Sequence, residues 1–451
     1  MTSQQTAFPC AIVPSSPAEC RLLGLYQQRQ EGRWMQRVKI IGGILKHHQW
    51  SALADMCRRY TPSAPLLLTT RQDIEFHNLT TETIPLLQAE LAHAGLTSVG
   101  ACGDTLRNIT VCPGNGLCHD TPDLTAIVLA LRGYLESYVG IYSLPRKFKI
   151  SFSACTKACA QPWINDLGFV VQRENSAVTV TAIGAGSLGP RPATGILIEE
   201  NLTPEDIPAL AQAAIRVFDK YGDRQHRAKA RLRHVRERCG DERFLELLHE
   251  EQREVKREAP PQMPPISVPD LHYNHVADLN IIYGGLTPDQ AEAIAALIHN
   301  HAVKARPQTH HRISLFARNA AAARNAVQTN PVLKQLADGA DVVSCPGTTY
   351  CAHALVNTHA VEKALRLQVP DTKNRAVRIS GCPNMCAQSG VADIGLIGKT
   401  RKDDAGNRVE GFMVVTGGGM GTTAAMAEKS HDFVPSEKIP ELVKNILHES
   451  F

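Results

Sequence analysis

The chain has 451 residues, of which 43% are hydrophobic and 20% are charged, and its formal net charge is +4. This length accommodates two or three domains with a substantial core, and the composition excludes a disordered or fibrous protein. No stretch approaches the roughly eighteen apolar residues of a membrane helix, and the start lacks a basic segment followed by an apolar run. We therefore expect no membrane partner and a cytoplasmic location, where reduced thiols can bind metal.

Predicted strands and helices alternate from about residue 20 to 200. A strand with a Gly-Gly turn (MQRVKIIGGIL) precedes the helix HHQWSALADMCRRY, and a further strand leads into TTRQDIEFHN. The helix TETIPLLQAELAHAG precedes a close pair of cysteines, and the helix DLTAIVLALRGYLESY leads into the strand KFKISF. A second cysteine pair follows, then NDLGFVVQ and the Gly-rich AIGAGSLGPRP.

A charge-dense segment, predicted to be a helical linker over 204–265, separates this copy from the next. Its basic residues are Arg224, Arg227, Lys229, Arg231, Arg233, Arg236 and Arg238. Two interpretations stay open: a solvated helix face, or a surface for an acidic electron donor or for cofactor carboxylates. We expect no nucleic acid partner, because acidic residues follow at once and no aromatic residues interleave.

The same order of elements returns from about residue 266 to 451. It contains DLNIIYGGL, the helix TPDQAEAIAALIHNHAV, a strand in RISLFARN, a cysteine pair, the strand AVRIS, a second cysteine pair, VADIGLIG and VVTGGGMG. The repeat predicts two fused copies of one α+β unit, with mixed sheets covered by helices. Two such copies would meet across a pseudo-twofold axis, and a shared cofactor is expected at their interface.

Cysteine spacing is the most informative feature of the sequence, because Cys-x5-Cys followed by Cys-x3-Cys occurs once in each copy. The first set is Cys112, Cys118, Cys155 and Cys159, and the second is Cys345, Cys351, Cys382 and Cys386. Four thiolates in two close pairs suit a [4Fe–4S] cluster, in which each iron takes one soft sulfur ligand. Disulfides are the alternative, which a long chain without a secretory signal disfavours. The other cysteines are predicted to be core thiols: Cys10, Cys20, Cys57, Cys102 and Cys239.

Basic residues gather beside the strand ends of the first copy: Arg71, Arg107, Arg146, Lys147 and Lys149. Strand alternation places Lys147 and Lys149 on one side and Phe148 on the other. Plain surface charge is the alternative for each, but two lysines on one face next to iron chemistry indicate an anion pocket.

The second copy has lost most of these cations. Aligned on the cysteines, Ala340, Asn374 and Ala376 stand where the first copy has Arg107, Lys147 and Lys149. Arg312 is predicted to correspond to Arg71, since both begin an Arg-x6-Asn pattern.

Together these residues resemble the siroheme-dependent sulfite and nitrite reductases over nearly the whole chain. The matching stretches are TTRQDIEFH, GDTLRNI, LPRKFK, CPGTTYC, SGCPNMC and RAKARL. The resemblance implies an α+β fold of two tandem repeats, each a ferredoxin-like half-domain plus a mixed α/β domain of the 4Fe-4S type. The expected bounds are 20–95 and 96–203 in the first copy, and 266–335 and 336–451 in the second.

The resemblance also implies an activity: the six-electron reduction of sulfite to sulfide, or of nitrite to ammonia, at a siroheme coupled to a [4Fe–4S] cluster. By carry-over Cys386 bridges the two cofactors, and Cys345, Cys351 and Cys382 complete the cluster. The matching anion-binding cations are Arg71, Arg107, Lys147 and Lys149, which would also stabilise developing charge and relay protons. Further residues expected at the cofactor are Arg146, Asn384, Gly417, Gly418 and Gly419, with tight turns as the alternative for the glycines.

Three further expectations concern substrate, donor and cluster number. Nitrite-reducing members often have Asn where this chain has Lys149, and two lysines suit the more highly charged sulfite, so sulfite is favoured over nitrite. The sequence shows no flavin or nicotinamide fingerprint, which makes a small ferredoxin the leading electron donor. The usual single-chain members keep cluster cysteines only in the second half, so the first set predicts a second [4Fe–4S] cluster, a relay or a remnant of duplication.

Two other functions stay open. One is a relative without siroheme that acts on an organic substrate, as the precorrin-3B synthases do, although the retained cations argue against it. The other is an electron-transfer protein whose clusters carry out no chemistry of their own.

Overall fold

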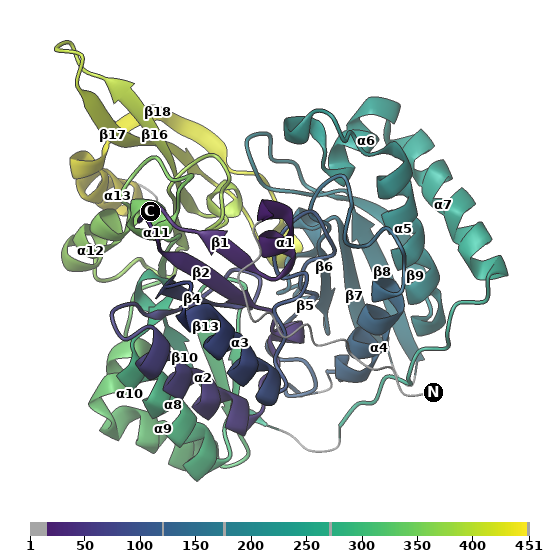
Figure 1. Cartoon of the computed structure of the whole chain (residues 1–451), viewed down its shortest axis with the longest axis horizontal. Helices are drawn as coiled ribbons and strands as arrows, with labels where there is room; N and C mark the ends of the chain where they lie inside the picture. The colour runs from purple at the N-terminus through teal and green to yellow at the C-terminus, as the bar shows by residue number, and fades with distance from the viewer. Residues whose placement is uncertain (1–15, 120, 175–176, 270–272, 449–451) are drawn as a thin grey trace.

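The computed structural model describes residues 16–119, 121–174, 177–269 and 273–448, and Figure 1 shows them as sheets covered by helices. The described chain begins with the short helix α1 (Pro17–Leu22). Among the cysteines expected to be core thiols, Cys20, Cys57 and Cys102 are buried and Cys239 is half-buried, whereas Cys10 lies outside the described residues. No helix in the described ranges combines the length and the apolar character needed to cross a membrane.

The first ferredoxin-like half-domain is an antiparallel sheet that borrows one strand from the second half. Its strands lie in the order β1 (Leu25–Gln27), β2 (Trp34–Val38), β4 (Ile74–Leu79), β3 (Leu66–Leu68) and β11 (Gly285–Leu286). Two helices belong to it, α2 (His47–Tyr60) and α3 (Thr83–His93). In α2, Trp50, Leu53 and Cys57 are buried because their spacing of three and four residues puts them on one helix face.

The second half-domain repeats this plan with a smaller sheet. Its antiparallel strands lie in the order β10 (Asn274–Asn280), β13 (Arg312–Ala317) and β12 (Lys304–Pro307), and its helices are α8 (Pro288–His301), α9 (Ala320–Thr329) and α10 (Pro331–Ala337). Thr287 caps α8 by accepting a hydrogen bond from the backbone N–H of Gln290 at 3.2 Å. Helices α2 and α8 pack together, and the buried side chains of both half-domains form one hydrophobic core.

The first domain of the 4Fe-4S type has a mixed sheet in chain order. Its strands are β5 (Thr110–Val111), β6 (Ile150–Ser153), β7 (Leu167–Glu174), β8 (Ala177–Gly184) and β9 (Ile196–Leu202). The first three strands are parallel, and the last two continue antiparallel. Its helices are α4 (Thr125–Glu136), α5 (Ile207–Tyr221), α6 (Leu232–Cys239) and α7 (Asp241–Arg257).

The segment 204–265 is helical as predicted, but its helices are part of this domain. Phe218 of α5, Leu232 of α6 and Leu248 of α7 are fully buried in the same core as Phe152 and Phe169 of the sheet. The segment therefore does not act as a free linker, because its apolar face covers the sheet of the first half.

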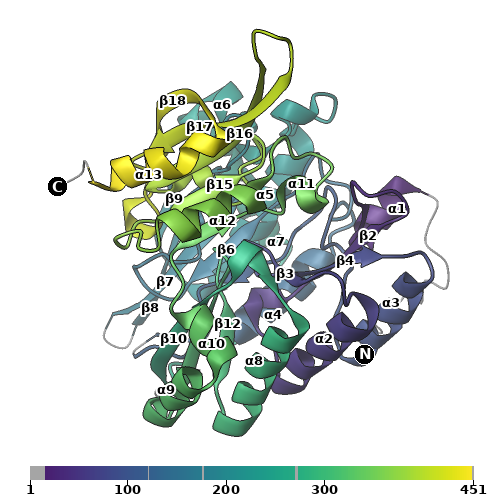
Figure 2. The same cartoon turned by 90° about the vertical axis from the view of Figure 1, so that its left-hand side faces the viewer.

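The second domain of the 4Fe-4S type repeats the first. Its strands, again in chain order, are β14 (Val342–Ser344), β15 (Val377–Ser380), β16 (Ile394–Lys402), β17 (Arg408–Thr416) and β18 (Glu428–Pro435). Its helices are α11 (Gly347–Tyr350), α12 (Thr358–Gln368) and α13 (Ile439–His448), and Figure 2 shows α12 and α13 together over one face of the sheet. The parallel and antiparallel pairings follow the first domain, which confirms the α+β fold of two tandem repeats related by a pseudo-twofold axis.

Candidate active site

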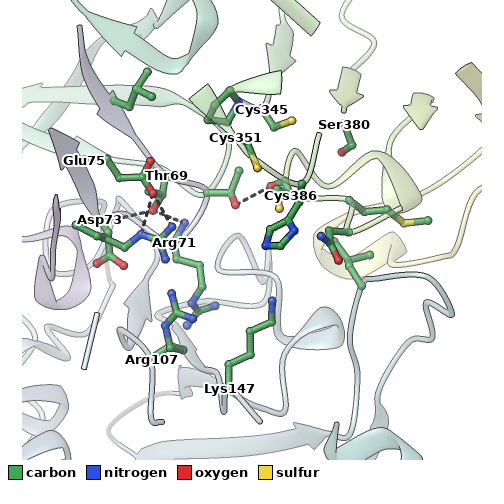
Figure 3. Close-up of a pocket in the computed structure, with 18 of the residues that line it drawn as sticks. Thr69, Arg71, Asp73, Glu75, Arg107, Lys147, Cys345, Cys351, Ser380 and Cys386 are labelled. Atoms are coloured by element: carbon green, nitrogen blue, oxygen red, sulfur yellow. Dashed lines mark hydrogen bonds and ion pairs between the residues drawn. The ribbon is translucent and has the colours of Figure 1, made fainter. Parts of the chain in front are cut away.

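One cavity of about 910 Å³ lies where the two halves meet, and both halves line it. The second half contributes all four cysteines of its set, Cys345, Cys351, Cys382 and Cys386. The first half contributes the predicted cations Arg71, Arg107, Arg146, Lys147 and Lys149. Figure 3 shows Arg71, Arg107 and Lys147 facing the cysteines across this space. The two groups of residues that the sequence singled out therefore meet in one site.

The four cysteines are held by backbone hydrogen bonds at the ends of two parallel strands. Cys345 follows β14, and its sulfur accepts a hydrogen bond from the N–H of Gly381 at 3.1 Å. The N–H of Cys351 donates to the carbonyl of Gly347 at 3.0 Å. A Cβ at Gly347 would lie 2.8 Å from the backbone nitrogen of Thr358, so this tight turn requires glycine. The thiol of Cys345 is buried, which raises its pKa to about 12.

No three His, Cys, Asp or Glu side chains in the described ranges converge closely enough to hold a single metal ion. A cubane cluster makes no such demand, because its four cysteine ligands bind four different iron atoms. All eight cysteines of the two sets are free thiols in the structure, so none of them forms the disulfide that was the alternative.

Arg71 is fixed in the cavity wall by neutral partners. It lies in the turn between β3 and β4, where the hydroxyl of Thr69 accepts from the N–H groups of Arg71 and Asp73 at 3.2 and 3.0 Å. Its guanidinium donates to Oδ1 of Asn165 at 2.7 Å and to the carbonyl of Ile150 at 3.0 Å. No carboxylate pairs with Arg71 among the described residues, and its buried Nε has no hydrogen-bond partner there. A guanidinium without a counter-ion and with an unpartnered buried N–H group is stabilised by an anionic ligand.

The cations of the cavity have lowered pKa values, because burial disfavours their charged forms. Burial lowers the pKa of Arg71 to about 9, and it also lowers the pKa of Arg107. Burial, followed by the charge of Arg231, lowers the pKa of Lys147 to about 7. Burial and the charge of Lys147 hold the pKa of Lys149 well below its usual value. The cavity thus holds more positive charge than its own residues neutralise, which favours an anion.

The structure adds residues that sequence reasoning left undecided. Arg231 lines the cavity and forms a buried ion pair with Asp166 at 2.7 Å. Arg227 also lines the cavity, and it binds Asp104 at 2.5 Å beside Arg146, which binds the same carboxylate at 3.0 Å. Part of the basic cluster of 204–265 is therefore directed at the cavity rather than at solvent. Its basic composition was the available signal, while nothing in the sequence indicated which of its members would turn inward.

Only some of the residues that were expected to bind the cofactor line the cavity. Asn384 lines the cavity, whereas Gly417, Gly418 and Gly419, all within the described residues, lie outside its lining. A Cβ at Gly418 would lie 2.6 Å from the backbone of Val391, and Gly417 has a φ of 75°. The alternative, a tight turn packed against backbone, accounts for these glycines.

In the second half, the position that corresponds to Arg71 is not occupied by a cation. The N–H of Thr69 donates to the carbonyl of Asp73 at 2.8 Å, and that of Gln308 donates to the carbonyl of Arg312 at 2.8 Å. This equivalence makes His310, not Arg312, the counterpart of Arg71, so the predicted correspondence is wrong by two residues. The strand pairing supports this equivalence, because Leu68 pairs with Ile74 in the first half and Pro307 pairs with Ile313 in the second.

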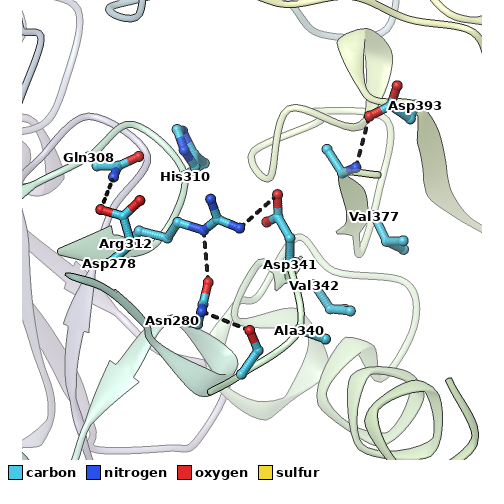
Figure 4. A network of polar contacts seen from close by, with 12 residues as sticks. Asp278, Asn280, Gln308, His310, Arg312, Ala340, Asp341, Val342, Val377 and Asp393 are labelled. Carbon is cyan, nitrogen blue, oxygen red and sulfur yellow. Dashed lines mark hydrogen bonds and ion pairs between the residues drawn. The ribbon is translucent and has the colours of Figure 1, made fainter. Parts of the chain in front are cut away.

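The positive charge next to this second turn is neutralised by the carboxylate of Asp341. Arg312 binds Asp341 at 2.9 Å, and Arg378 binds the other oxygen of the same carboxylate at 2.8 Å. Figure 4 shows the contacts of Arg312 with Asp341 and with Asn280, to which Arg312 donates at 2.8 Å. Burial and the charge of Arg378 lower the pKa of His310 to about 3, so this histidine is neutral at physiological pH. Among the described residues that line the cavity, every arginine and lysine comes from the first half.

Comparisons with known proteins agree with this site. A model of the nitrite and sulphite reductase 4Fe-4S domain matches residues 102–256 and 337–448, and one of the nitrite/sulfite reductase ferredoxin-like half domain matches residues 26–94. The chain belongs to the nitrite and sulfite reductase family. It is therefore an oxidoreductase of this family, whose cofactors are a [4Fe–4S] cluster and siroheme.

Two relatives and one solved structure show how far the likeness of this reductase extends. It is 31% identical to a ferredoxin–nitrite reductase of Synechococcus elongatus, over 93% of this chain and 86% of that protein. It is 27% identical to an assimilatory ferredoxin-dependent nitrite reductase of Haloferax mediterranei, over 94% of this chain and 80% of that protein. The Mycobacterium tuberculosis NirA protein has the same fold, with a TM-score of 0.81 and 23% identity over 95% of this chain and 86% of that one.

The cavity of this reductase fits such cofactors. The cysteines offer four sulfur ligands on one wall, and Arg146, Arg227 and Arg231 offer partners for the carboxylates of siroheme. Buried polar atoms without a partner among the described residues, Nε of Arg71 and of Arg107, are left for an anionic group.

Proposed function

We propose that this reductase converts nitrite to ammonia in a six-electron reduction, with electrons delivered by ferredoxin. One observation carries the proposal: four half-buried cations, for which the described residues supply no carboxylate partner, share a cavity with four cysteines in cluster spacing. The names of the relatives from Synechococcus and Haloferax support nitrite as substrate and ferredoxin as donor. A siroheme and its cluster, held in this cavity, would pass on the electrons of the donor and would supply the metal to which the substrate binds.

We assign the cluster to Cys345, Cys351, Cys382 and Cys386, and the bridging thiolate to Cys386. Cys386 lies at the end of the Cys-x3-Cys loop, and its carbonyl accepts a hydrogen bond from the hydroxyl of Thr70 at 2.9 Å. Thr70 precedes Arg71 in the chain, so this contact ties the cysteine loop of the second half to the anion-binding turn of the first. The two halves thereby fix the distance between the metal site and the cations.

The cations have different tasks in this proposal. Arg71 and Arg107 stay protonated, so they bind the anion and stabilise charge that develops as its N–O bonds break. Lys147 has a pKa near 7 in the cavity, which allows its Nζ to donate a proton and be reprotonated at neutral pH. Asn165 holds Arg71 in place through the hydrogen bond at 2.7 Å.

Sulfite is a second candidate substrate. Lys147 and Lys149 both line the cavity, and a second buried lysine suits an anion of higher charge. The relatives with nitrite in their names favour nitrite, whereas this pair of lysines favours sulfite. Measuring both anions on one preparation decides between them.

The test is a spectrum followed by an assay on protein purified without oxygen. Siroheme gives a Soret band together with a red band, whereas a cluster protein without it gives only a broad shoulder. The spectrum separates the proposal from an electron-transfer protein and from a relative without siroheme. Reduced ferredoxin and nitrite should then yield ammonia, and sulfite should yield sulfide more slowly. A preparation with both bands that converts neither anion would overturn the proposal.

A further inference from the structure

We propose that Cys112, Cys118, Cys155 and Cys159 hold a second [4Fe–4S] cluster, in the first half of the chain and separate from the siroheme cavity. None of these four cysteines lines the cavity in the described part of the chain. The proposed cluster site consists of residues of the first half alone, so its existence does not depend on the identity of the substrate.

The first reason is that the Cys-x5-Cys segments of the two halves are built alike. The N–H of Cys112 donates to the carbonyl of Phe152 at 3.0 Å, as Cys345 does to Ile379 at 3.0 Å. The sulfur of Cys112 accepts from the N–H of Ala154 at 3.1 Å, as that of Cys345 accepts from Gly381 at 3.1 Å. The first cysteine of each set is therefore oriented by hydrogen bonds to the strand and loop that lead into the second cysteine pair.

The turn to the second cysteine is also repeated. The N–H of Cys118 donates to the carbonyl of Gly114 at 3.0 Å, and that of Cys351 donates to Gly347 at 3.0 Å. In the first half, the sulfur of Cys118 would lie 2.4 Å from a Cβ at Gly114, so glycine is required for this sulfur position.

The Cys-x3-Cys loops match as well. The N–H of Ala158 donates to the carbonyl of Cys155 at 3.2 Å, and that of Met385 donates to Cys382 at 3.3 Å. Ala158 and Met385 both have left-handed backbones, with φ of 51° and 52°. Such a conformation is costly for residues other than glycine and is kept where the surroundings determine it. The first half thus preserves a strained loop whose counterpart aims two ligands at a cluster.

The two cysteine pairs of the first set meet at the ends of neighbouring parallel strands. Cys112 directly follows β5, and Cys155 lies two residues after the end of β6. The two strands pair in parallel, with Val111 opposite Phe152. The hydrogen bond from the N–H of Ala154 to the sulfur of Cys112 therefore brings the second pair next to the first.

This cluster would have no siroheme beside it. The positions equivalent to Arg71, Arg107, Lys147 and Lys149 are His310, Ala340, Asn374 and Ala376. The last of these equivalences is fixed by the backbone, because the N–H groups of Lys149 and Ala376 donate to Asp166 and Asp393 at 2.9 and 2.8 Å. At these four positions a carboxylate-rich macrocycle would find no cation.

The proposed cluster site reaches solvent on one side and lies next to the siroheme cavity on the other. Cys118 is exposed to solvent. Two residues after Cys159, Gln161 lines the siroheme cavity, and its side chain accepts a hydrogen bond from the N–H of Gly421 in the other half at 3.2 Å. The geometry suits a relay that takes one electron at a time from the donor and passes it toward the cavity, a role that rests on the proposed function.

The test is an iron and acid-labile sulfide count on anaerobic holoenzyme, with electron paramagnetic resonance after reduction. Two cubanes give about eight cluster irons per chain, four for each cubane, in addition to the haem iron. The double variant Cys118→Ser with Cys155→Ser should lose about four irons and keep the siroheme bands. Cys239→Ser, a half-buried cysteine outside both sets, should keep the full iron count.

The outcomes separate this inference from the proposed function. A wild-type count of about four cluster irons, unchanged in the double variant, would overturn the second cluster whatever the activity. A count of about eight with no reduction of nitrite or sulfite would keep the cluster and overturn the proposed function. Loss of the siroheme bands together with the irons in the double variant would show that the two sites are not separate.

Discussion

Arg71 and His310 occupy equivalent turns in the two halves, yet one is a buried cation facing the cavity and the other is a neutral ring. The repeat of the same hydrogen bond across each turn, at 2.8 Å in both, makes the equivalence firm. Beside His310, the charge of Arg312 is taken up by Asp341. Duplication thus produced two similar scaffolds, of which one keeps free positive charge and the other has neutralised it.

This asymmetry predicts the effect of Asp341→Asn on stability. Arg378 is only 1% exposed and loses its charged partner in the variant, as does Arg312. A buried cation without a counter-ion costs about 3 kcal/mol of unfolding free energy. Denaturant unfolding of the variant should show this loss. The control is Asp432→Asn, whose partners Lys399 and Arg401 are exposed, and which should cost less than about 1 kcal/mol. Equal small losses in both variants would contradict the role given to Asp341.

Asn165 is predicted to be a positioning residue for the anion site. Its side chain accepts from Arg71 at 2.7 Å and donates to the carbonyl of Gln161 at 2.6 Å. Asn165→Ala should lower kcat/KM for nitrite by roughly tenfold or more, the size of a lost hydrogen bond to a charged group. The loss should fall on both KM and kcat, since Arg71 binds the anion and also stabilises the charge that develops during the reaction.

The matched control for Asn165 is Asn280→Ala in the second half. Asn280 makes the same kind of contact, accepting from Arg312 at 2.8 Å, but Arg312 is not among the described residues that line the active-site cavity. This variant should leave kcat/KM unchanged. If both variants lowered kcat/KM equally, the effect would be one of general packing.

The sequence allowed the ligand sets and the fold to be predicted because both depend on local spacing. Cys382 and Cys386 are four residues apart in one loop, so their pattern is visible in a short window. Lys147 and Lys149 flank Phe148 just before β6, not within a strand as predicted, yet both line the cavity. The repeat of the whole unit then indicated that the two patterns meet at an interface.

Long-range pairing could not be read in this way. Arg231 reaches Asp166 across 65 positions of sequence, and nothing in a basic cluster marks which members, here Arg231 and Arg233, are buried. The strand β11 pairs with β3 over two residues, too few to show a period. The equivalence of Arg312 with Arg71 was wrong because the repeated Arg-x6-Asn letters begin two residues later relative to the strand in the second half, which only the strand pairing reveals.

Lys149 is predicted to set the preference between the two anions. The side chain lines the cavity beside Lys147, and Lys149→Asn removes one charge while keeping a polar group. The ratio of kcat/KM for sulfite to that for nitrite should fall by roughly tenfold, as expected for the loss of a charge-assisted hydrogen bond. Lys399→Asn, at the surface, should leave the ratio as it is. An unchanged ratio in Lys149→Asn would show that this lysine does not distinguish sulfite from nitrite.

The buried Lys39 predicts a pH dependence of stability in the alkaline range. Its ammonium lies 3.5 Å from Glu136, with Arg132 and Asp73 as further charged neighbours, and burial lowers its pKa to about 8 despite the carboxylate. In the unfolded chain the pKa of a lysine is about 10.4. Between these values the unfolded state binds more protons, so the unfolding free energy contributed by this group rises with pH.

The measurement is the difference in unfolding free energy between wild type and Lys39→Met as a function of pH. At pH 7 the folded protein bears the cost of a buried charge, and Lys39→Met removes that cost. Between pH 8 and 10 wild type should gain relative to the variant by on the order of 2 kcal/mol, because it sheds the proton on folding. Lys399→Met, which removes an exposed lysine, should follow the wild-type slope. Parallel profiles for wild type and Lys39→Met would mean that Lys39 keeps its proton throughout and that Glu136 outweighs burial.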